Sequence, residues 1–596
     1  MHTQPARAAI TSAALVSTLA VTSAVLAGAN SFTVIGIPDT QFYSETYPQI
    51  FEVQTQWVAD NIDLLGIEFV SHYGDVVQHG DDVLEWANAE IALSILDASG
   101  IPWGVSAGNH DITPFGGDAS GYIPQDFFDR YGPSHWIGRP YFLECSPSGM
   151  SNAQVFQAGG REWLWLHIEC DVADRELSWA QGVLDRNRDK AAIVTTHRWL
   201  QDAEDYTGDV PIVPSGRYPS IWYAIENFHA PGGIQGEDAW RWFFRQNPSI
   251  FLINCGHFHE EFRQTSTNVK GLPVHEVLAD YQDDPNGGNG WLRIMEFDLA
   301  ANAIYVDSYS PYLNEYRYVD ESMFTLPVNF DAYRLAPGTA FAAFQQGILG
   351  YDGTRDTWIS EEDPNTSYGE DGVKEVDDDV NNGIFSDHRG QTLLKFTSVF
   401  GDGEGQAPAG SQIVEAWLTI ELANDIDHPI YDPDFFVYEM IVPWDESSTW
   451  NSMNDGLSPG QDLGQLIGTF RGDNDPDGDA TRRIDVTPLV QAWSNGQTNH
   501  GFGILPEIIS GNDDGISIFT SESGTAIIHP RLEVTYVAPE PICPADLSGD
   551  GTIDTTDLFE LLGAWGACPG CSADLTGDDL VDADDLFELL GAWGDC

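Results

Sequence analysis

The sequence of 596 residues carries 93 acidic and 25 basic side chains, which gives a formal net charge of −68. A chain of this length is expected to form about three or four domains rather than one. The charge argues against nucleic acid as a partner, because an acidic surface repels polyanions. It favours an extracellular, saline or calcium-rich setting, in which cations screen or bind the carboxylates.

The amino terminus has the pattern of a signal peptide, which we assign to residues 1–29. Arg7 precedes an apolar stretch over residues 8–27, and Ala27-Gly28-Ala29 offers small residues for cleavage. The alternative is an uncleaved membrane anchor, because the apolar run approaches the length of a membrane span. No later segment has that length and apolarity, so we expect a secreted or cell-surface-associated protein without a transmembrane segment after cleavage.

Residues 30–334 alternate strand-like and helical segments, the pattern of a layered α/β domain. Residues 49–65 and 173–188 place apolar side chains on one helical face. Brief segments rich in Ile and Val predict buried strands at residues 32–37, 67–72, 101–107, 191–195 and 250–254.

A short polar block follows each of these five predicted strands. In open α/β sheets, binding sites form at the carboxyl ends of strands, so residues scattered from 39 to 259 can converge on one cleft. A single block of this kind is weak evidence, but five in this order indicate one site. The blocks are Asp39-Thr40-Gln41, Gly74-Asp75 with Gln78, Gly108-Asn109-His110-Asp111, Thr196-His197 and Gly256-His257-Phe258-His259.

The donor groups of these blocks predict a centre of two divalent metals, Mn, Fe or Zn, that hydrolyses a phosphate ester. Paired cations neutralise phosphate oxygens and create hydroxide near neutral pH. Such a pair needs a bridging carboxylate, for which Asp75 is the candidate. The remaining expected ligands are Asp39 and His259 for the first metal, and Asn109, His197 and His257 for the second.

His110 and Asp111 are the expected catalytic residues beside this centre. Water activated between the metals would attack phosphorus in line while His110 protonates the departing oxygen, and Asp111 would orient or charge His110. His72 and His79 flank the Gly-Asp block. Their side chains either contact and orient the metal ligands, or have ordinary structural roles in the core and at the surface.

These blocks resemble the calcineurin-like metallophosphoesterase superfamily, whose pattern is Asp-x-His, Gly-Asp, Gly-Asn-His-Asp or Glu, a single His, and Gly-His-x-His. The resemblance covers about residues 31–320 and implies the four-layered αββα fold and the ligand roles given above. Gln41 stands where many members have histidine. Pro38-Asp39-Thr40-Gln41, with Ala279-Asp280-Tyr281-Gln282 and residues 287–293, resembles a secreted bacterial branch that shares this glutamine. We therefore include Gln41 among the expected ligands, although an amide oxygen is harder than imidazole and uncharged.

Residues 335–537 change to aromatic-rich strands separated by Gly, Asp and Asn turns, which predicts an all-β sandwich. Residues 344–347, 351–359, 393–396 and 484–487 resemble the DNRLRE-type β-sandwich modules of secreted bacterial proteins, some of which bind polysaccharide. Trp444 and Trp450 either stack on sugar rings or pack in the core. Residues 538–542, with Pro539 and Pro541, are expected to form a stiff linker.

The tail, residues 543–596, contains two copies of an EF-hand-like calcium loop, each followed by Leu-Phe-Glu-Leu-Leu-Gly-Ala-Trp-Gly. Alternating oxygen donors on a tight loop suit Ca²⁺. Position 12 is Asp rather than Glu, and Gly551 at position 6 becomes Asp579 in the second copy, which predicts a looser second loop. The expected ligands at positions 1, 3, 5, 7, 9 and 12 are Asp546, Ser548, Asp550, Thr552, Asp554 and Asp557, then Asp574, Thr576, Asp578, Leu580, Asp582 and Asp585.

The duplicated tail resembles the dockerin module, which implies attachment to a cohesin-like scaffold. The alternative is a calcium-rigidified surface or sorting tag. Cys543 with Cys568, and Cys571 with Cys596, each bracket one repeat, so we expect two disulfides there, with the connectivity left open. A zinc or redox role for the Cys-x-x-Cys at 568–571 is the other interpretation.

Together these patterns predict a secreted, dinuclear-metal-dependent phosphoesterase of multidomain architecture, attached through a calcium-binding dockerin-like tail. The substrate is a phosphate ester whose identity the sequence leaves open. The alternative is a surface-attachment or polysaccharide-binding protein, held to a scaffold or a cell-surface polysaccharide, whose phosphoesterase fold has weak or no activity.

Overall fold

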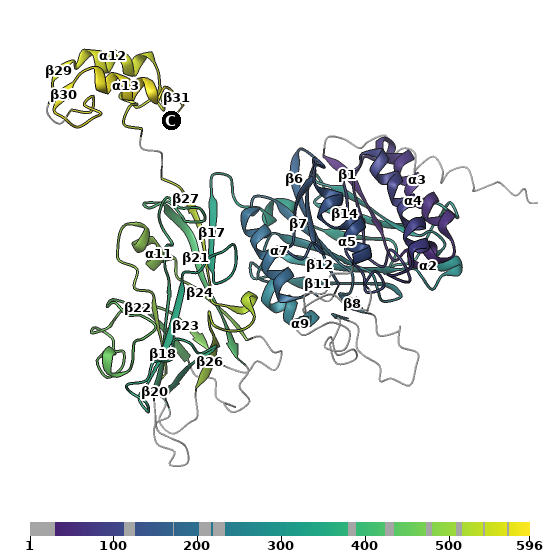
Figure 1. Ribbon diagram of the computed structural model, residues 1–596, viewed down its shortest axis with the longest axis horizontal. Helices are drawn as coiled ribbons and strands as arrows, with labels where there is room; N and C mark the ends of the chain where they lie inside the picture. The colour runs from purple at the N-terminus through teal and green to yellow at the C-terminus, as the bar shows by residue number, and fades with distance from the viewer. Residues whose placement is uncertain are drawn as a thin grey trace, which may run out of the picture.

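The computed structural model describes residues 30–112, 125–170, 172–201, 216–217, 233–378, 389–423, 434–472, 480–507, 515–539, 543–568 and 571–595. The expected signal peptide (1–29), part of the expected linker (540–542) and Cys596 lie outside the described residues. Within the described part, an α/β unit is followed by a β-rich unit and a small helical tail (Figure 1).

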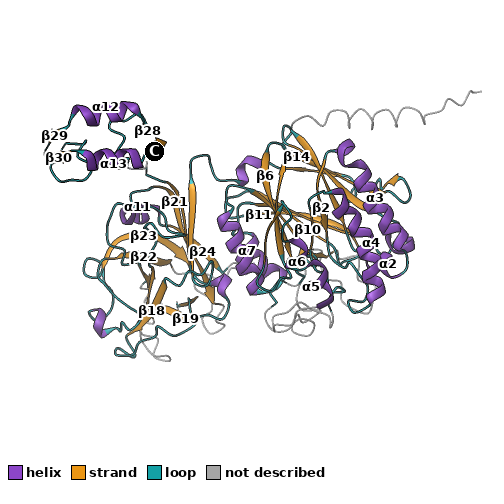
Figure 2. Ribbon diagram, turned by 45° about the horizontal axis from the view of Figure 1, so that its top comes forward, coloured by secondary structure: helices purple, strands orange, loops and turns teal. Residues whose placement is uncertain are grey.

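The α/β unit has four layers, as expected. Two sheets lie face to face, with α3 and α4 covering the outer face of one and α7 the outer face of the other (Figure 2). The layer between the sheets is filled by apolar side chains, many of them aromatic, among them Phe69 and Trp165, whose rings stack at 4.6 Å. Such rings bury large apolar areas and hold the two sheets together.

In the first sheet, β1, β2 and β3 run parallel, and β13 pairs antiparallel with β1. The strand order is β15-β14-β13-β1-β2-β3, with β16 beside β14. Bounds are β1 (Ser31–Ile37), β2 (Ile67–His72), β3 (Trp103–Val105), β13 (Leu292–Asp298), β14 (Ala303–Ser310), β15 (Glu315–Tyr316) and β16 (Phe324–Pro327).

In the second sheet, β6, β7, β10 and β12 run parallel, flanked by antiparallel strands. The order is β11-β12-β10-β7-β6-β5-β4. Bounds are β4 (Phe142–Cys145), β5 (Asn152–Ala158), β6 (Arg161–Ile168), β7 (Ala191–Thr196), β10 (Ile250–Cys255), β11 (Glu260–Thr267) and β12 (Pro273–Asp280); β8 (Leu200–Gln201) pairs with β9 (Gly216–Arg217) outside this sheet.

The helices begin and end where local chemistry allows. Pro48 opens α3, Gly66 closes it in the left-handed conformation, and the Asp82 carboxylate caps the first turn of α4. Bounds are α2 (Gln41–Glu45), α3 (Pro48–Leu65), α4 (Val83–Ser99), α5 (Gln125–Tyr131), α6 (Pro133–Trp136), α7 (Asp174–Arg186), α9 (Gly236–Ala239), the π-helix η2 (Trp240–Phe244), α10 (Pro285–Gly288) and the 3₁₀ turn η3 (Phe330–Tyr333).

The β-rich unit is built around one apolar core. Trp444 and Trp450 are buried in a smaller cluster beside it. Of the two roles considered for them, packing in the core is therefore correct, and stacking on sugar rings at the surface is wrong. A short helix, α11 (Thr487–Ser494), interrupts the strands. Strand bounds are β17 (Ala340–Gln345), β18 (Thr354–Ser360), β19 (Val373–Asp378), β20 (Arg389–Phe396), β21 (Gln412–Ala423), β22 (Asp434–Met440), β23 (Leu463–Arg471), β24 (Thr481–Asp485), β25 (Phe502–Pro506), β26 (Ile516–Phe519) and β27 (Arg531–Val537), with the 3₁₀ turns η4 (Asn451–Met453) and η5 (Ala526–Ile528).

The β-rich unit packs directly on α7 of the α/β unit. Ile527 and Ile528 join the core beneath that helix. Asp174 at its start accepts the backbone N–H groups of Ala526 and Ile527, and Asp185 near its end binds Arg531 through two hydrogen bonds of 3.0 and 2.6 Å. The two units therefore share a buried, charged interface.

The tail folds as two matching loop-helix units around its own small core. Antiparallel pairs of β28 with β31 and β29 with β30 tie the two units together. Cys568 forms a disulfide with Cys571, and Cys543 is also disulfide-bonded, so the structure gives a connectivity that the sequence had left open. Bounds are β28 (Thr552–Ile553), α12 (Thr555–Gly563), β29 (Gly566–Ala567), β30 (Leu580–Val581), α13 (Ala583–Gly591) and β31 (Gly594–Asp595).

Candidate metal centre

The five predicted polar blocks all follow strands that run parallel to a neighbour in one of the two sheets. The first three blocks follow β1, β2 and β3, and the other two follow β7 and β10. Carboxyl ends of parallel strands meet at one sheet edge. Each sheet thus delivers its blocks to one edge, and the contacts between the blocks show that the two edges meet at a common site.

Three of the candidate ligands have backbone conformations that non-glycine residues rarely adopt. Asp39, Asp75 and His257 have φ angles of 43°, 50° and 74°. Asp and His tolerate the left-handed region better than most residues, but a group of them is unusual and points to a functional site. The turns that follow β1, β2 and β10 thereby direct these side chains into a shared space.

Two glycines make room for the carboxylates of this space. A Cβ atom at Gly108 would lie 2.1 Å from Asp75 Oδ1, and one at Gly256 would lie 2.0 Å from Asp39 Oδ2. Any larger residue would collide with a ligand oxygen. The glycines of the Gly-Asn-His-Asp and Gly-His-x-His blocks are therefore required by close approach to the opposite ligand, in addition to their place at strand ends.

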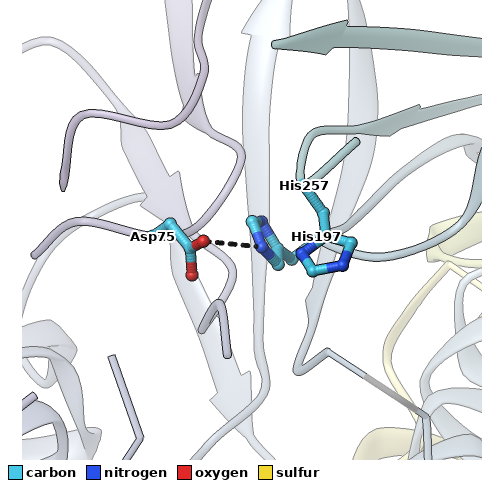
Figure 3. A group of neighbouring side chains, drawn as sticks. All are labelled: Asp75, His197 and His257. Atoms are coloured by element: carbon cyan, nitrogen blue, oxygen red, sulfur yellow. Dashed lines mark ion pairs between the residues drawn. The ribbon is translucent and has the colours of Figure 1, made fainter. Parts of the chain in front are cut away.

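Asp75, His197 and His257 form a compact group (Figure 3) in which each residue offers one ligand atom within 4.8 Å of the others. His197 Nε2 lies 3.2 Å from Asp75 Oδ2 and 3.1 Å from Asn109 Oδ1. Ligand atoms at about 2.0–2.2 Å from one cation are themselves about 3 Å apart, so these separations suit a shared metal.

The tautomer of His197 favours the same interpretation. Its Nδ1 lies 2.9 Å from the carbonyl oxygen of Tyr73. Because a carbonyl only accepts, Nδ1 carries a hydrogen, so Nε2 is the nitrogen directed at Asp75 and Asn109, and it would bind a cation on losing its own proton. Tyr73 carries no sequence signal for this role, since any residue at that position supplies the same backbone oxygen.

Asp39 lies beside the group, with its Oδ1 3.8 Å from His197 Nδ1, and its surroundings suit a cation. Its Oδ1 accepts the backbone N–H of His257 at 3.0 Å, whereas its buried Oδ2 has no hydrogen-bond partner among the described residues. Burial and the charges of Asp280 and Asp75 raise the pKa of Asp39 well above its usual range. A buried carboxylate oxygen without a donor is costly unless a cation binds it.

The other ionisation shifts also suit metal ligands. Burial raises the pKa of Asp75, but the charge of His197 and its hydrogen bond outweigh this effect and bring it below the ordinary value. Burial and the nearby cationic group of Arg198 lower the pKa of His257 far below its usual range, so its imidazole is neutral. Carboxylate and neutral imidazole are the forms that bind divalent metals.

Gln41 lies at the edge of this group, in contact with residues that the sequence analysis gave no role. Its amide contacts the side chain of Gln282 and lies 3.5 Å from Asp75 Oδ2. Gln282 is in turn held by Asp280, the last residue of β12, through its backbone N–H and its amide. An Asp at the end of a further parallel strand was the signal that could have identified Asp280.

His259 lies outside the compact group. Its Nδ1 is 2.9 Å from Asp283 Oδ2, and its side chain is partly exposed. The predicted role of His259 beside Asp39 on the first metal stays a prediction. The two histidines of this block, His257 and His259, face different partners, because the left-handed backbone of His257 changes the direction of the chain before His259.

Asp111 has a different role from the predicted one. Its two buried carboxylate oxygens accept the backbone N–H groups of Val76, Val77 and Gly108 at 2.7, 3.1 and 2.8 Å. It therefore joins the loop after β2 to the loop after β3. The group that orients His110 is instead the carbonyl of Gln78, which lies 2.9 Å from His110 Nδ1.

His72 and His79 both support the loop that carries Asp75. His72 is buried, accepts the N–H of Gly74 and bonds to Thr40 Oγ1 at 2.9 Å. His79 lies at the surface, with Nδ1 2.7 Å from Glu85 Oε1. The first is a support in the core, and the second belongs to a separate polar cluster described below.

The tail presents two loops of nearly identical geometry. Asp546 accepts the backbone N–H groups of residues 549–551, and Asp574 accepts those of residues 577–579. Buried Asp557 and Asp585 close each loop through two backbone N–H groups. Asp579 takes the same left-handed conformation as Gly551, so the second loop keeps the tight turn of the first.

Among the helices of the described residues, none combines the length and apolarity needed to cross a bilayer.

Residues 32–261 match the family model described as calcineurin-like phosphoesterase. The uncharacterised protein YvnB of Bacillus subtilis is 33% identical over 301 residues, which are 48% of this chain and 20% of that protein. The chain thus spans about a fifth of the length of this curated relative.

Two solved structures are also similar. A dimetal phosphatase from Danio rerio is 12% identical, with 50% of this chain and 98% of that chain covered and a TM-score of 0.30. The purple acid phosphatase PPD1 from yellow lupin is 14% identical, with 51% and 55% covered and a TM-score of 0.31. From the family match over these residues, the segment 32–261 of this chain is a calcineurin-like phosphoesterase domain.

Proposed function

We propose that this chain is an exported, metal-dependent phosphoesterase that hydrolyses phosphate mono- or diesters. The observation that carries the proposal is the convergence of Asp39, Asp75, Asn109, His197 and His257, with Asp39 Oδ2 buried and unpartnered among the described residues. Two divalent cations, Mn, Fe or Zn, held there would neutralise phosphate oxygens and lower the pKa of bound water.

The ligand set divides around Asp75, the candidate bridging carboxylate. Asn109, His197 and His257 would hold one cation with Asp75, since His197 Nε2 lies 3.2 Å from the Asp75 oxygen and 3.1 Å from the Asn109 oxygen. Asp39 would hold the other cation. The Gln41 amide lies next to both Asp75 and Gln282. His259 joins this second set only if it exchanges its contact with Asp283.

His110 is the proposed general acid. Its Nδ1 carries a hydrogen because the carbonyl of Gln78 only accepts, so the proton given to the leaving oxygen comes from Nε2 of the imidazolium form. The His110 backbone N–H donates to Asp75 Oδ1 at 2.8 Å, which ties the acid to the bridging carboxylate. Asp111 acts through the backbone and is a positioning residue.

The test is turnover of an aryl phosphate monoester and a diester with added Mn²⁺ or Zn²⁺. We expect Asp75→Asn and His257→Ala to lower kcat by about 10²–10³-fold or more, the scale of losing one electrostatic contact to a transition state. His500→Ala, on the β-rich unit, is the matched histidine control and is expected to keep full activity. Unchanged turnover in Asp75→Asn would refute the site.

Export and attachment are further parts of the proposal. The leader-like residues 1–29, the acidic composition and the Cys568–Cys571 disulfide support an oxidising, extracellular setting. The matching loops support Ca²⁺ binding by both repeats. Phe559 and Phe587 are 70% and 68% exposed at equivalent positions of α12 and α13, which supports attachment through these helices to a cohesin-like scaffold. A cell-surface polysaccharide is the competing partner.

The competing function is a surface-attachment or polysaccharide-binding protein with a weakly active or inactive phosphoesterase fold. It predicts weak or no turnover of either ester at any metal concentration. Burial of Trp444 and Trp450 removes the residues that the sequence analysis considered for sugar stacking. The hydrolytic function is therefore preferred.

A further inference from the structure

A second group of potential metal ligands lies apart from the candidate centre. Glu45 is the last residue of α2, Glu85 lies in the first turn of α4, and His79 lies in the loop between β2 and α4. Each offers one ligand atom, and the three atoms lie within 4.8 Å of one another. We propose that these residues bind a divalent transition metal such as Zn²⁺, and that this peripheral cation holds His110 in position.

The donor set suits such a cation. One imidazole nitrogen and two carboxylates are ligands that Zn²⁺ accepts in proteins. The His79 side chain is 57% exposed, so a cation reaches it from solvent, whereas the Glu85 side chain is 7% exposed and fixed. With Asp82 nearby, the negative charge around His79 exceeds what one imidazolium offsets, and a divalent ion would balance it.

The cluster is joined to the candidate catalytic acid by a single peptide group. Glu85 Oε2 accepts the backbone N–H groups of Gln78 and His79, each at 2.8 Å. The His79 N–H and the Gln78 carbonyl belong to one rigid plane. That carbonyl is the group 2.9 Å from His110 Nδ1, so a movement of Glu85 or His79 tilts the acceptor that orients His110.

Helix α2 closes the cluster from the other side. Ser44 Oγ donates to the Val76 carbonyl at 2.6 Å, and Asn88 Nδ2 on α4 donates to the Ser44 carbonyl at 2.8 Å. The backbone next to Glu45 is therefore fixed to both the loop and α4, while the Glu45 side chain is exposed. A cation bound by all three residues would cross-link α2, the loop after β2 and α4, and would restrain the Gln78–His79 peptide.

The binding test is equilibrium dialysis of the full chain with Zn²⁺ alone, followed by metal analysis. We expect Glu45→Gln and His79→Gln each to bind one equivalent less than wild type, because the candidate centre and the tail are untouched. Glu52→Gln, an exposed glutamate on α3, is the matched control and is expected to keep the wild-type count. Equal counts in all four proteins would overturn the proposal.

The link to His110 rests on the proposed phosphoesterase function and has its own test. A poor leaving group needs protonation by the acid, whereas 4-nitrophenolate needs little. With Zn²⁺ present, we expect Glu45→Gln to lower kcat for an alkyl phosphate about 10-fold, the low end for partners that orient a functional group, and to change 4-nitrophenyl phosphate much less. Equal effects on both substrates would refute the link.

The two proposals fail in different ways. If wild type hydrolyses neither substrate, the phosphoesterase function is wrong, and the Zn²⁺ count still decides whether the peripheral site exists. If wild type is active but Glu45→Gln keeps the full Zn²⁺ count, the peripheral site is wrong and the function stands.

Discussion

The contact between α7 and the β-rich unit provides a quantitative test of whether the two units behave as one folded body. Arg531, at the start of β27, is buried and donates two hydrogen bonds to Asp185 on α7. It also lies 3.4 Å from Glu533. The substitution Arg531→Met keeps much of the apolar stem of the side chain, but it leaves the buried Asp185 carboxylate without the guanidinium group that donates to it.

The expected cost is about 3–5 kcal/mol of unfolding free energy, because breaking one side of a buried ion pair leaves an uncompensated charge. Lys270→Met is the control from the same interface. Lys270 pairs with Glu415 across the two units, but both side chains are about one-third exposed, so its loss is expected to cost at most about 1 kcal/mol.

The assay is urea unfolding of the full chain followed by tryptophan fluorescence and calorimetry. We expect the transitions of the two units to overlap in wild type and to separate in Arg531→Met. A double-mutant cycle with Asp185→Asn isolates the coupling between the two side chains. If Arg531→Met costs no more than Lys270→Met, or the cycle shows no coupling, the inference of a shared cooperative interface is refuted.

Three further predictions concern the site, acid stability and the tail. Gly256→Ala should abolish metal binding in a folded protein, since its Cβ would lie 2.0 Å from Asp39 Oδ2; retained metal content contradicts this. Burial lowers the pKa of His72 to about 3, whereas an unfolded histidine titrates near 6.5, so stability present above pH 6.5 is lost as pH falls toward 3. His72→Gln should flatten that dependence in denaturation series, and equal slopes would contradict it. Millimolar Ca²⁺ should raise the unfolding temperature of the tail, and Asp546→Ala should reduce the shift because only the second loop remains intact; calorimetry with no response to Ca²⁺ rules out calcium loops.

Much of the candidate centre could be predicted because its residues follow strands, and strands are visible as apolar runs. Asp39, Asp75 and His197 each come within three residues of a strand end, and parallel strands bring such ends to one edge. The layered α/β class followed from the same alternation of strands and helices, whereas the four-layered order was implied by the resemblance to calcineurin-like phosphoesterases. Neither inference required knowledge of which side chains touch.

Contacts that depend on the path of the backbone were not predictable. Asp111 was expected beside His110, but the loops after β2 and β3 place three backbone N–H groups around its carboxylate first. His259 was expected with Asp39, and its contact with Asp283, after the left-handed turn at His257, had no signal in the sequence. Local spacing cannot reveal these partners, because they come from loops distant in the chain.

The sequence by itself determined the layered α/β unit, the strand ends that supply donor groups, and the duplicated loop-helix tail, because hydrophobic period and turn chemistry are local properties. Only the tertiary structure decided which donors share a space, that Cys568 pairs with Cys571, and that Glu45, His79 and Glu85 meet near His110. Those outcomes depend on long-range packing, in which a turn of one residue redirects a side chain to a different partner.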